Sequence, residues 1–558
     1  MSTHDTQTPP FAVVAHAPRS DDPALITRLA EALDEVGYRG QPVAELLGGA
    51  AVEALSREQP VPALRALRRV AASADPLSSP ARLAVVVELF RLARPVGQRA
   101  LERALPGVGV GELTRLGLVE VREGTVRSLV DLDIHETDEL RLRVVSDLTG
   151  WQRPGAALRP DHVLGVGGAS RTLMQITDPR PVDRALDVGT GCGVQCFHLL
   201  RRAAHVTATD LSRRALAFAR FNLVLNAAEL ELDPLEPEAR VELREGSLLE
   251  PVAGRRFDLV VSNPPFVITP RTPDEDEGRR YTYRDGGRRG DALVAELLGA
   301  VADALLPGGS AHLLANWEIP AEDETAPERT WSRRVEQWIP PQLDAWVIQR
   351  EIEAPELYAE TWLRDSSEHV RREHYEEAYA AYLEDFAVRE VAAVGFGWVR
   401  LDRPQEAAGR APRRRFEHLG HPARQPVGAV LAQSVHRAEQ LERLGDDWVE
   451  THLVPVEHVT EERHQRPGAE DPSIILLRQG AGLQRTRVLT SAAAGLVGAC
   501  DGELSVGQIT AALGALLDWQ APTGGGRAPE ASALLEEVRD LLLDGFLEMA
   551  GGSPIRDD

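Results

Sequence analysis

The stretch ALDVGTGCGVQ, residues 185–195, constrains the fold more than any other part of the sequence. β-Forming residues lead up to Asp187, the glycines Gly189, Gly191 and Gly193 then alternate, and a helical pattern follows. Glycine tolerates positive φ and lets the backbone approach another group closely. A helix that starts after such a turn presents unpaired backbone N–H groups. The stretch therefore predicts a tight strand-to-helix turn that can hold a ligand.

Strand and helix patterns alternate around this turn, from residue 139 to residue 402. The expected strands lie in seven stretches: RALDVGTG, AHVTATDLS, RVELREGS, FDLVVSNPP, GGSAHLLANWE, LDAWVIQREI and VGFGWVRLD. Helical patterns at 194–203, 212–227, 290–306 and 367–389 separate most of them. Alternating β and α predicts an α/β domain with a parallel, doubly wound sheet.

Other patterns flank this region. We expect a disordered tail over 1–22, and a run of helices followed by two strands around a Glu-Gly turn over 23–138. That order resembles a winged-helix domain. A linker rich in Pro, Arg and Ala is expected over 403–427, and a second winged-helix-like domain over 428–558. Such modules often contact nucleic acid or protein, and domains that only pack beside the core are the alternative.

Composition limits the class of protein. With 558 residues, 43% hydrophobic and 27% charged residues, the chain has the composition of a soluble globular protein of several domains. The formal net charge of −24 argues against a general polyanion binder. The three cysteines form no CxxC pair and the histidines no metal-binding spacing, so we expect neither disulfides nor a metal. Without a signal peptide or a membrane-spanning run in the sequence, a cytoplasmic location is expected.

Three further strands end in polar residues. Asp210 ends the second strand, where an acidic side chain can accept hydrogen bonds from both hydroxyls of a ribose. Ser212 is placed to cap the helix that follows. Ser247 follows Gly246 at the end of the third strand.

The fourth strand ends in SNPPF, with Asn263, Pro264, Pro265 and Phe266. Proline fixes its own φ and removes a backbone donor, so this exit is rigid. Asn-Pro-Pro-Phe after a glycine-turn first strand resembles the (N/D)-PP-(Y/F/W) motif of N-methyltransferases.

This resemblance has a physical reason. A planar amide or aromatic amine is a poor nucleophile because its lone pair is delocalised. The side-chain oxygen of Asn263 and the backbone carbonyl of Pro264 can each accept one N–H of such a nitrogen, which aligns its lone pair with a sulfonium methyl group. Pro265 helps to fix both acceptors in advance, and Phe266 can stack on the planar group.

Together, the D-x-G-x-G-x-G turn, Asp210 and the NPPF motif resemble class I S-adenosylmethionine-dependent methyltransferases, in particular the group that includes the release factor glutamine methyltransferases and the rRNA guanine-N2 and adenine-N6 methylases. In the NAD fingerprint G-x-G-x-x-G the third glycine would come one residue later, at Val194. The resemblance covers about residues 160–320 and implies a Rossmann-like, seven-stranded core and S-adenosylmethionine as cofactor. It implies cofactor contacts from these residues: Asp187, Gly189, Thr190, Gly191, Gly193, Asp210, Leu211, Ser247 and Asn263. Ser247 stands where many relatives have an aspartate.

The same resemblance adds weaker candidates on either side of the motifs. Gly167, Gly168 and Thr172 lie where relatives fold a segment over the methionine end of the cofactor. Arg284 and Asp285 can position the substrate, or they can form a surface salt bridge.

The expected activity is methyl transfer from S-adenosylmethionine to a planar nitrogen. The preferred substrate is a glutamine side-chain amide in a protein such as a release factor. An exocyclic amine of adenine or guanine in RNA or DNA is the alternative, and a cofactor-binding regulator without catalysis is an alternative of another class. Asn263 argues against the regulator, because a sensor needs no amine acceptors.

Overall fold

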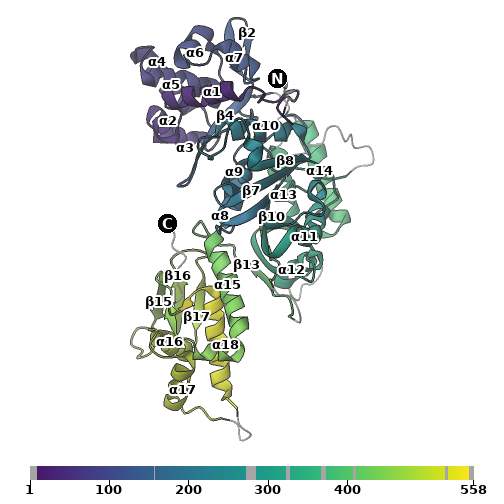
Figure 1. Ribbon diagram of the computed structural model, residues 1–558. Helices are drawn as coiled ribbons and strands as arrows, with labels where there is room; N and C mark the ends of the chain where they lie inside the picture. Colours follow the sequence, from purple (N-terminus) through teal and green to yellow (C-terminus); the bar gives the residue numbers. More distant parts are fainter. Residues whose placement is uncertain are drawn as a thin grey trace, which may run out of the picture. The chain divides into compact units, whose positions relative to one another are not determined.

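The computed structural model describes residues 9–155, 158–271, 284–321, 327–365, 372–405, 410–521 and 526–551 (Figure 1). The chain divides into two compact units. The first comprises Met1–Met174 and Arg180–Gly420, and the second Gln175–Pro179 and His421–Asp558. None of the helices in the described ranges has the length and hydropathy needed to cross a bilayer. Over the same ranges, no group of three or more His, Cys, Asp or Glu is arranged to hold a metal.

The first unit begins with a helical region. Its helices are α1 (Pro23–Glu35), α2 (Gly40–Leu47), α3 (Gly49–Leu55), α4 (Val61–Ser73), α5 (Ser79–Val86), which continues into a π-helical turn (Val87–Arg91), α6 (Gln98–Ala104) and α7 (Val110–Arg115). A small sheet of order β1-β3-β2 accompanies them, from β1 (Val96–Gly97), β2 (Val119–Arg122) and β3 (Thr125–Ser128). The Glu-Gly turn between β2 and β3 is where the sequence predicts it. An antiparallel hairpin of β4 (Val130–Glu136) and β5 (Arg141–Asp147) follows.

An eight-stranded sheet of order β13-β11-β12-β10-β9-β6-β7-β8 forms the core of this unit. Its strands are β6 (Val182–Val188), β7 (Ala203–Asp210), β8 (Val241–Glu245), β9 (Phe257–Ser262), β10 (Leu305–Pro320), β11 (Asp344–Glu353), β12 (Val391–Asp402) and β13 (Arg414–His418). The helices between them are α8 (Gly168–Ile176), α9 (Val194–Leu199), α10 (Arg213–Leu225), α11 (Ala292–Ala304), α12 (Pro327–Trp338), α13 (Pro355–Asp365) and α14 (Arg372–Val388). The neighbouring pairs from β8 to β10 are parallel, and β12 runs antiparallel to both β10 and β11. This topology confirms the expected α/β class and all seven predicted strands.

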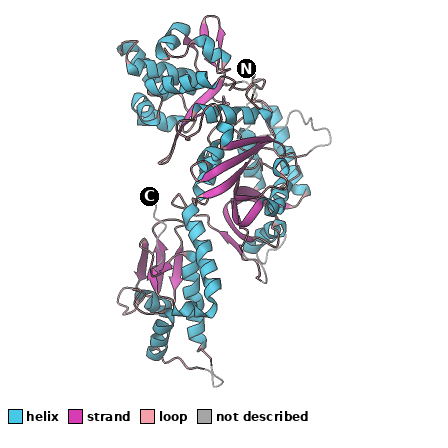
Figure 2. Cartoon of the chain, in the orientation of Figure 1, coloured by secondary structure: helices cyan, strands magenta, loops and turns pink. Residues whose placement is uncertain are grey.

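Helices cover both faces of the sheet (Figure 2). Successive side chains along a strand point to opposite faces, so neighbouring residues of one strand contact different helices. Leu186 belongs to the buried cluster that α11 and α12 form with one face, around Leu298 and Trp331. Its neighbour Asp187 points to the other face, where it accepts a hydrogen bond from the backbone N–H of Cys196 in α9. The end of β6, which leads into the glycine turn, is therefore fixed by contacts on both faces of the sheet.

Two segments differ from their expected structure. Residues 1–8 of the expected tail lie outside the described residues, but Ala12 is buried and Ser20 accepts hydrogen bonds from Arg220 of α10. Those side-chain contacts give the segment a defined path without any periodic pattern that a sequence could reveal. The expected linker at 403–427 contains β13, which pairs in parallel with β11 and adds an eighth strand to the seven.

The second unit combines helices with small sheets. Its elements are α15 (Gly428–Leu444), β14 (Leu453–Pro455), β15 (Val459–His464), β16 (Ile474–Gln479), β17 (Thr486–Leu489), α16 (Ser491–Gly498), α17 (Val506–Leu516), α18 (Pro529–Asp544) and β18 (Leu547–Met549). β15, β16 and β17 form one antiparallel sheet, and β14 pairs with β18. A core around Leu496, Val538 and Phe546 joins the helices.

Candidate functional site

A cavity of about 490 Å³ lies at the carboxyl ends of β6, β7, β8 and β9. Ligands of open α/β sheets bind at this edge, and the volume is within the range of small-molecule sites. The predicted site residues that line the cavity are Gly189, Thr190, Gly191, Asp210, Leu211, Ser247, Asn263, Pro264 and Pro265. Asp187, Gly193 and Phe266 are not among its lining residues.

The glycine turn presents backbone to the cavity. The N–H groups of Gly189 and Thr190 both donate to the carbonyl of Thr209 at 2.9 Å, which ties the end of β6 to β7. Gly191 has a φ of +56°, and a Cβ there would meet no atom within 4 Å. Its backbone is therefore open to a ligand.

Gly193 has a different structural role. Its φ is +99°, and a Cβ would lie 2.5 Å from the ring of Phe197 and 3.4 Å from Cα of Ala219. Gly193 thus lets the start of α9 pack closely against α10, and the sequence spacing alone could not separate this role from ligand contact.

Asp187 lies beneath the turn. It is 1% exposed, and Oδ2 accepts the Cys196 N–H at 3.1 Å. Burial, with a smaller contribution from the nearby Asp210 carboxylate, raises the pKa of this carboxyl to about 7. Asp187 therefore holds the first turn of α9 rather than forming the cavity surface.

Asp210 connects three elements at the cavity wall. Oδ2 accepts the Gly191 N–H at 2.9 Å and Oδ1 accepts the Ser212 N–H at 2.8 Å. Burial raises the pKa of Asp210, and the two backbone donors oppose that shift. Ser212 caps α10, as predicted, by accepting the Ala215 N–H at 3.2 Å. A carboxylate has about four acceptor positions, so Asp210 keeps capacity for hydroxyl donors.

Apolar surface is exposed at the same cavity. The side chains of Leu211 and Leu164 both line it and are 63% and 49% exposed. Ser247 lines it between Gly246 and Leu248. Exposed leucines beside a polar rim suit a flat, partly apolar ligand.

The Asn-Pro-Pro-Phe exit forms the other side of the cavity. The Ser262 hydroxyl donates to the Val188 carbonyl at 2.8 Å, which joins the ends of β9 and β6. Within the described ranges, the Asn263 side-chain amide makes no hydrogen bond to another protein group. The Pro264 carbonyl accepts the Phe266 N–H at 2.8 Å and keeps one of its two lone pairs. Phe266 itself is partly buried against the core.

Residues 284–288 lie against this exit. The Val267 N–H donates to the Arg284 carbonyl at 2.8 Å, and the Gly286 N–H donates to the Pro265 carbonyl at 3.2 Å. The carboxylate of Asp285 lines the cavity and forms an ion pair with Arg271. The Asp285 and Arg271 side chains are 5% and 16% exposed, so this contact is buried rather than a surface salt bridge. Arg284 donates to the Trp362 carbonyl at 2.8 Å and does not line the cavity.

The segment before α8, together with α8 and α9, contributes further cavity residues, and apart from Gly167 the sequence motifs do not reveal them. The cavity is also lined by His162, Val163, Leu164, Gly165, Gly167, Ser170 and Gln195. Of the three weaker candidates there, Gly167 lines the cavity, and Gly168 and Thr172 do not. Gln195 donates to the Ser170 carbonyl at 2.7 Å, which ties α9 to α8. Glutamine after a glycine turn carries no pattern of its own, so only the tertiary contact identifies it.

Two family models match parts of the chain. The methyltransferase small domain matches residues 165–275, which include the glycine turn and the Asn-Pro-Pro-Phe exit. A domain of unknown function, DUF7059, matches residues 35–129 in the helical region.

Curated relatives match the same core. A release factor glutamine methyltransferase of Deinococcus radiodurans is 38% identical over 136 residues, which are 23% of this chain and 43% of that protein. A ribosomal protein uL3 glutamine methyltransferase of Bradyrhizobium diazoefficiens is 33% identical over 150 residues, 26% of this chain and 44% of that protein. The chain thus spans less than half the length of these two relatives.

A third relative is covered more fully. A release factor glutamine methyltransferase of Caulobacter vibrioides is 31% identical over 220 residues, which are 34% of this chain and 72% of that protein. This match extends beyond the residues around the cavity to most of the relative. The chain therefore belongs to the family of class I methyltransferases that includes the release factor glutamine methyltransferases.

Proposed function

We propose that this chain transfers a methyl group from S-adenosylmethionine to the side-chain amide nitrogen of a glutamine in a protein. The observation that carries the proposal is a single shared cavity: the glycine turn and Asp210 line one side of it, and Asn263 and Pro264 line the other. A methyl donor and an amide acceptor can meet there.

The residues present fit the cofactor. The Asp210 carboxylate has acceptor capacity for ribose hydroxyls, Leu211 and Leu164 offer exposed apolar surface for a purine, and Ser247 offers a hydroxyl at its edge. Gly189 and Gly191 let backbone approach without a side chain between. When bound, S-adenosylmethionine supplies a methyl group on a positively charged sulfur.

The substrate side follows from the acceptors at the β9 exit. The Asn263 amide oxygen and the remaining lone pair of the Pro264 carbonyl accept the two N–H groups of the target amide. With S-adenosylmethionine bound, the nitrogen lone pair held by these two acceptors would face its methyl carbon, and the new N–C bond would form as the S–C bond breaks with its electron pair going to sulfur. After transfer the methylated nitrogen is positively charged, and it becomes neutral when one N–H proton leaves to water. The Phe266 N–H holds the Pro264 carbonyl and the Gly286 N–H holds the next carbonyl, that of Pro265, which lowers the reorganisation needed at the reaction.

A protein substrate is favoured over nucleic acid by local charge. The Tyr358 hydroxyl of α13 accepts the Ile268 N–H at 2.8 Å, so α13 lies beside the segment that follows Phe266. Outward-facing or partly buried carboxylates on α13 and α14 are Glu356, Glu360, Glu376, Glu377 and Glu384. An acidic surface repels phosphate backbones, whereas it tolerates a neutral or basic peptide loop. Release factors and ribosomal protein uL3, the acceptors named for the relatives, are the first candidates.

The flanking modules extend the proposal. The helical region has the order α5-β1-α6-α7-β2-β3, which supports a winged-helix-like module within residues 23–138. We assign it, and the expected C-terminal module at 428–558 within the second unit, to binding the substrate protein or its ribosomal or nucleic-acid context in the cytoplasm. The chemistry itself can be tested with both modules in place.

The test supplies the full chain with tritiated-methyl S-adenosylmethionine and, in separate reactions, a bacterial release factor, ribosomal protein uL3, ribosomal RNA and duplex DNA. We expect protease-sensitive, nuclease-resistant label on a glutamine of a protein acceptor. Label in RNA or DNA would replace the amide proposal with base methylation, and cofactor binding without any transfer would favour the regulator.

Variants of Asn263 test the mechanism in the same assay. Asn263→Ala removes one acceptor, and we expect kcat to fall about 100-fold or more, with a far smaller change in the Kd of S-adenosylhomocysteine. Asn263→Asp keeps an acceptor oxygen and should retain more activity than Asn263→Ala. Full activity in Asn263→Ala would overturn the mechanism.

A further inference from the structure

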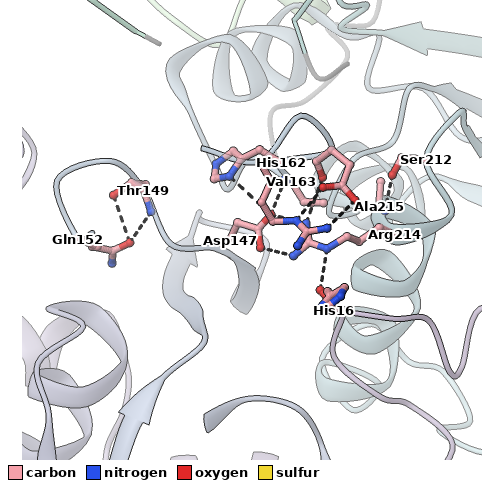
Figure 3. Close-up of polar contacts among 11 residues, drawn as sticks. His16, Asp147, Thr149, Gln152, His162, Val163, Ser212, Arg214 and Ala215 are labelled. Atoms are coloured by element: carbon pink, nitrogen blue, oxygen red, sulfur yellow. Dashed lines mark hydrogen bonds and ion pairs between the residues drawn. The ribbon is translucent and has the colours of Figure 1, made fainter. Parts of the chain in front are cut away.

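A buried ion pair between Asp147 and Arg214 joins α10 to three other segments of the chain (Figure 3). Arg214, in the first turn of α10, binds both carboxylate oxygens of Asp147 at the end of β5. The same guanidinium donates from Nε to the His16 carbonyl at 2.6 Å and from Nη1 to the Asp161 carbonyl at 3.1 Å. Arg214 and Asp147 are 7% and 6% exposed.

Asp147 is bonded directly to the cavity wall. Its Oδ2 accepts the Val163 N–H at 2.8 Å, and its own N–H donates to the Val163 carbonyl at 3.0 Å. Figure 3 shows His162 beside Asp147, and its ring Nδ1 lies 3.6 Å from the same oxygen. His162 and Val163 both line the cavity, and Asp147 does not.

Arg214 is close to the opposite wall in the same way. It lies between Ser212 and Ala215, which both line the cavity, and it does not line the cavity itself. Its guanidinium also stacks over the Phe218 ring at 5.0 Å, which fixes its direction along α10. The ion pair therefore links the segment around Val163 to the start of α10. Asp147 and Arg214 do not line the cavity themselves, but each is bonded to or adjoins residues that do.

Such a link has few alternative geometries. A buried guanidinium must find acceptors for its N–H groups, and a bidentate pair with a carboxylate is short and directional. Here the acceptors come from the N-terminal segment, β5 and the segment before α8. Moving β5 would leave a buried charge unpaired, and moving either of the other two segments would leave a buried N–H group of Arg214 without its acceptor.

We propose that Asp147 and Arg214 are positioning residues for the cofactor: without touching it, they hold the 162–165 wall at the distance from α10 that S-adenosylmethionine requires. They therefore set cofactor affinity, and they make that affinity depend on the N-terminal segment through the His16 carbonyl. This inference rests on the cofactor of the proposed function.

A matched control comes from the neighbouring strand. Asp131 of β4 is also buried, at 4% exposure, and pairs with Arg91 at 3.0 Å and with Gln152 at 2.9 Å. Neither Asp131 nor Arg91 lines the cavity. Asp131→Asn and Asp147→Asn thus each neutralise a buried, arginine-paired carboxylate of one hairpin, and only the second change acts on the cavity wall.

The experiment measures the Kd of S-adenosylhomocysteine by calorimetry for the wild-type chain, Asp147→Asn, Arg214→Lys and Asp131→Asn, with urea unfolding of each. We expect Kd to rise about tenfold in Asp147→Asn, equal to about 1.4 kcal/mol, and to stay within about twofold in Asp131→Asn. Arg214→Lys keeps the charge, but its three N–H donors cannot serve all four acceptor oxygens, so its Kd should lie between those of wild type and Asp147→Asn. In methyl transfer, KM for S-adenosylmethionine should rise while kcat at saturation is retained.

Hydrogen exchange on the wild-type chain tests the same link without a variant. Binding of S-adenosylhomocysteine should slow exchange in peptides of 143–149 as well as 160–165, because Asp147 and Val163 share two hydrogen bonds. An unchanged Kd in Asp147→Asn, equal shifts in both aspartate variants, or no change over 143–149 would each overturn the inference. Failure of the wild-type chain to bind S-adenosylhomocysteine would instead refute the proposed cofactor.

Discussion

The Asp210 carboxylate accepts a hydrogen bond from the Gly191 backbone N–H at 2.9 Å, across 19 residues of sequence. This contact joins the end of β7 to the middle of the glycine turn. Asp210 thus holds the glycine turn in place and also lines the cavity. Its removal should therefore weaken cofactor binding in two ways.

Asp210→Ala tests this dual role. Loss of a charged acceptor for hydroxyl donors costs about 1.5–3 kcal/mol, so the Kd of S-adenosylhomocysteine should rise about 10- to 150-fold. Calorimetry gives the value directly. Asp258→Ala is the control, because Asp258 also accepts a backbone N–H, from Arg184, but lies outside the cavity lining. Equal effects of the two variants would contradict the assignment of Asp210.

The two neighbouring glycines should respond differently to alanine. Gly193→Ala places a Cβ 2.5 Å from Phe197 at a φ of +99°, and strain plus overpacking should lower the free energy of unfolding by about 2–4 kcal/mol. Gly191→Ala meets no atom within 4 Å, so it should cost about 1–2 kcal/mol and mainly weaken cofactor binding. Urea unfolding and calorimetry of both variants separate the effects. A larger stability loss in Gly191→Ala would refute the division of roles.

The core of this fold was accessible from sequence because its signals are local. β6, β7 and β9 each end in a motif that must lie at the carboxyl edge of a parallel sheet, so the sequence alone predicts that Asp210, Gly191 and Asn263 share one site, and all three line the cavity. Strand alternation and glycine spacing need no tertiary information. The two roles at the glycine turn could not be separated in this way, since Gly193 is defined by the ring of Phe197.

The rest of the site depends on contacts between distant residues. Asp147 and Arg214 lie 67 residues apart, and neither belongs to a recognisable pattern. The sequence of the N-terminal segment predicts a disordered tail. Its defined path comes from arginines of α10, such as Arg220, that donate hydrogen bonds to its carbonyl groups, and the sequence does not show these contacts. β13 likewise pairs with β11 across a stretch whose composition resembles a linker.

Asp285 should control how firmly residues 284–288 lie on the Asn-Pro-Pro-Phe exit. Its carboxylate binds Arg271 and accepts the Gly287 N–H at 2.8 Å. Asp285→Asn leaves a buried guanidinium poorly paired, and kcat/KM for the protein substrate should fall about tenfold or more. Steady-state kinetics with saturating S-adenosylmethionine measure it. Glu296→Gln, which removes the exposed partner of Arg288, should leave kcat/KM unchanged; a similar loss there would attribute the effect to surface charge.

Asp187 should give the protein a distinctive pH dependence of stability. Burial raises its pKa from 3.8 to about 7, so the folded chain binds this proton more tightly than the unfolded chain does. Unfolding releases the proton between those values, and the stabilisation is complete below pH 3.8 and lost as the pH rises through about 7. Asp187→Asn lacks this titration and can still accept the Cys196 N–H. Its free energy of unfolding minus that of wild type should therefore increase from about pH 4 to about pH 7 and then level off.

Urea unfolding of the cofactor-free chain at a series of pH values measures this difference. Asp344→Asn provides the contrast: burial opposes the shift, but hydrogen bonds from Arg410 and Arg413 lower the pKa of Asp344. Its titration lies below its ordinary value of 3.8, where stability is lost as the pH falls. The Asp344→Asn difference should consequently be flat between about pH 4 and 7. A flat Asp187→Asn difference over the same interval would mean that Asp187 is ionised beneath the glycine turn throughout, and that burial does not hold its proton.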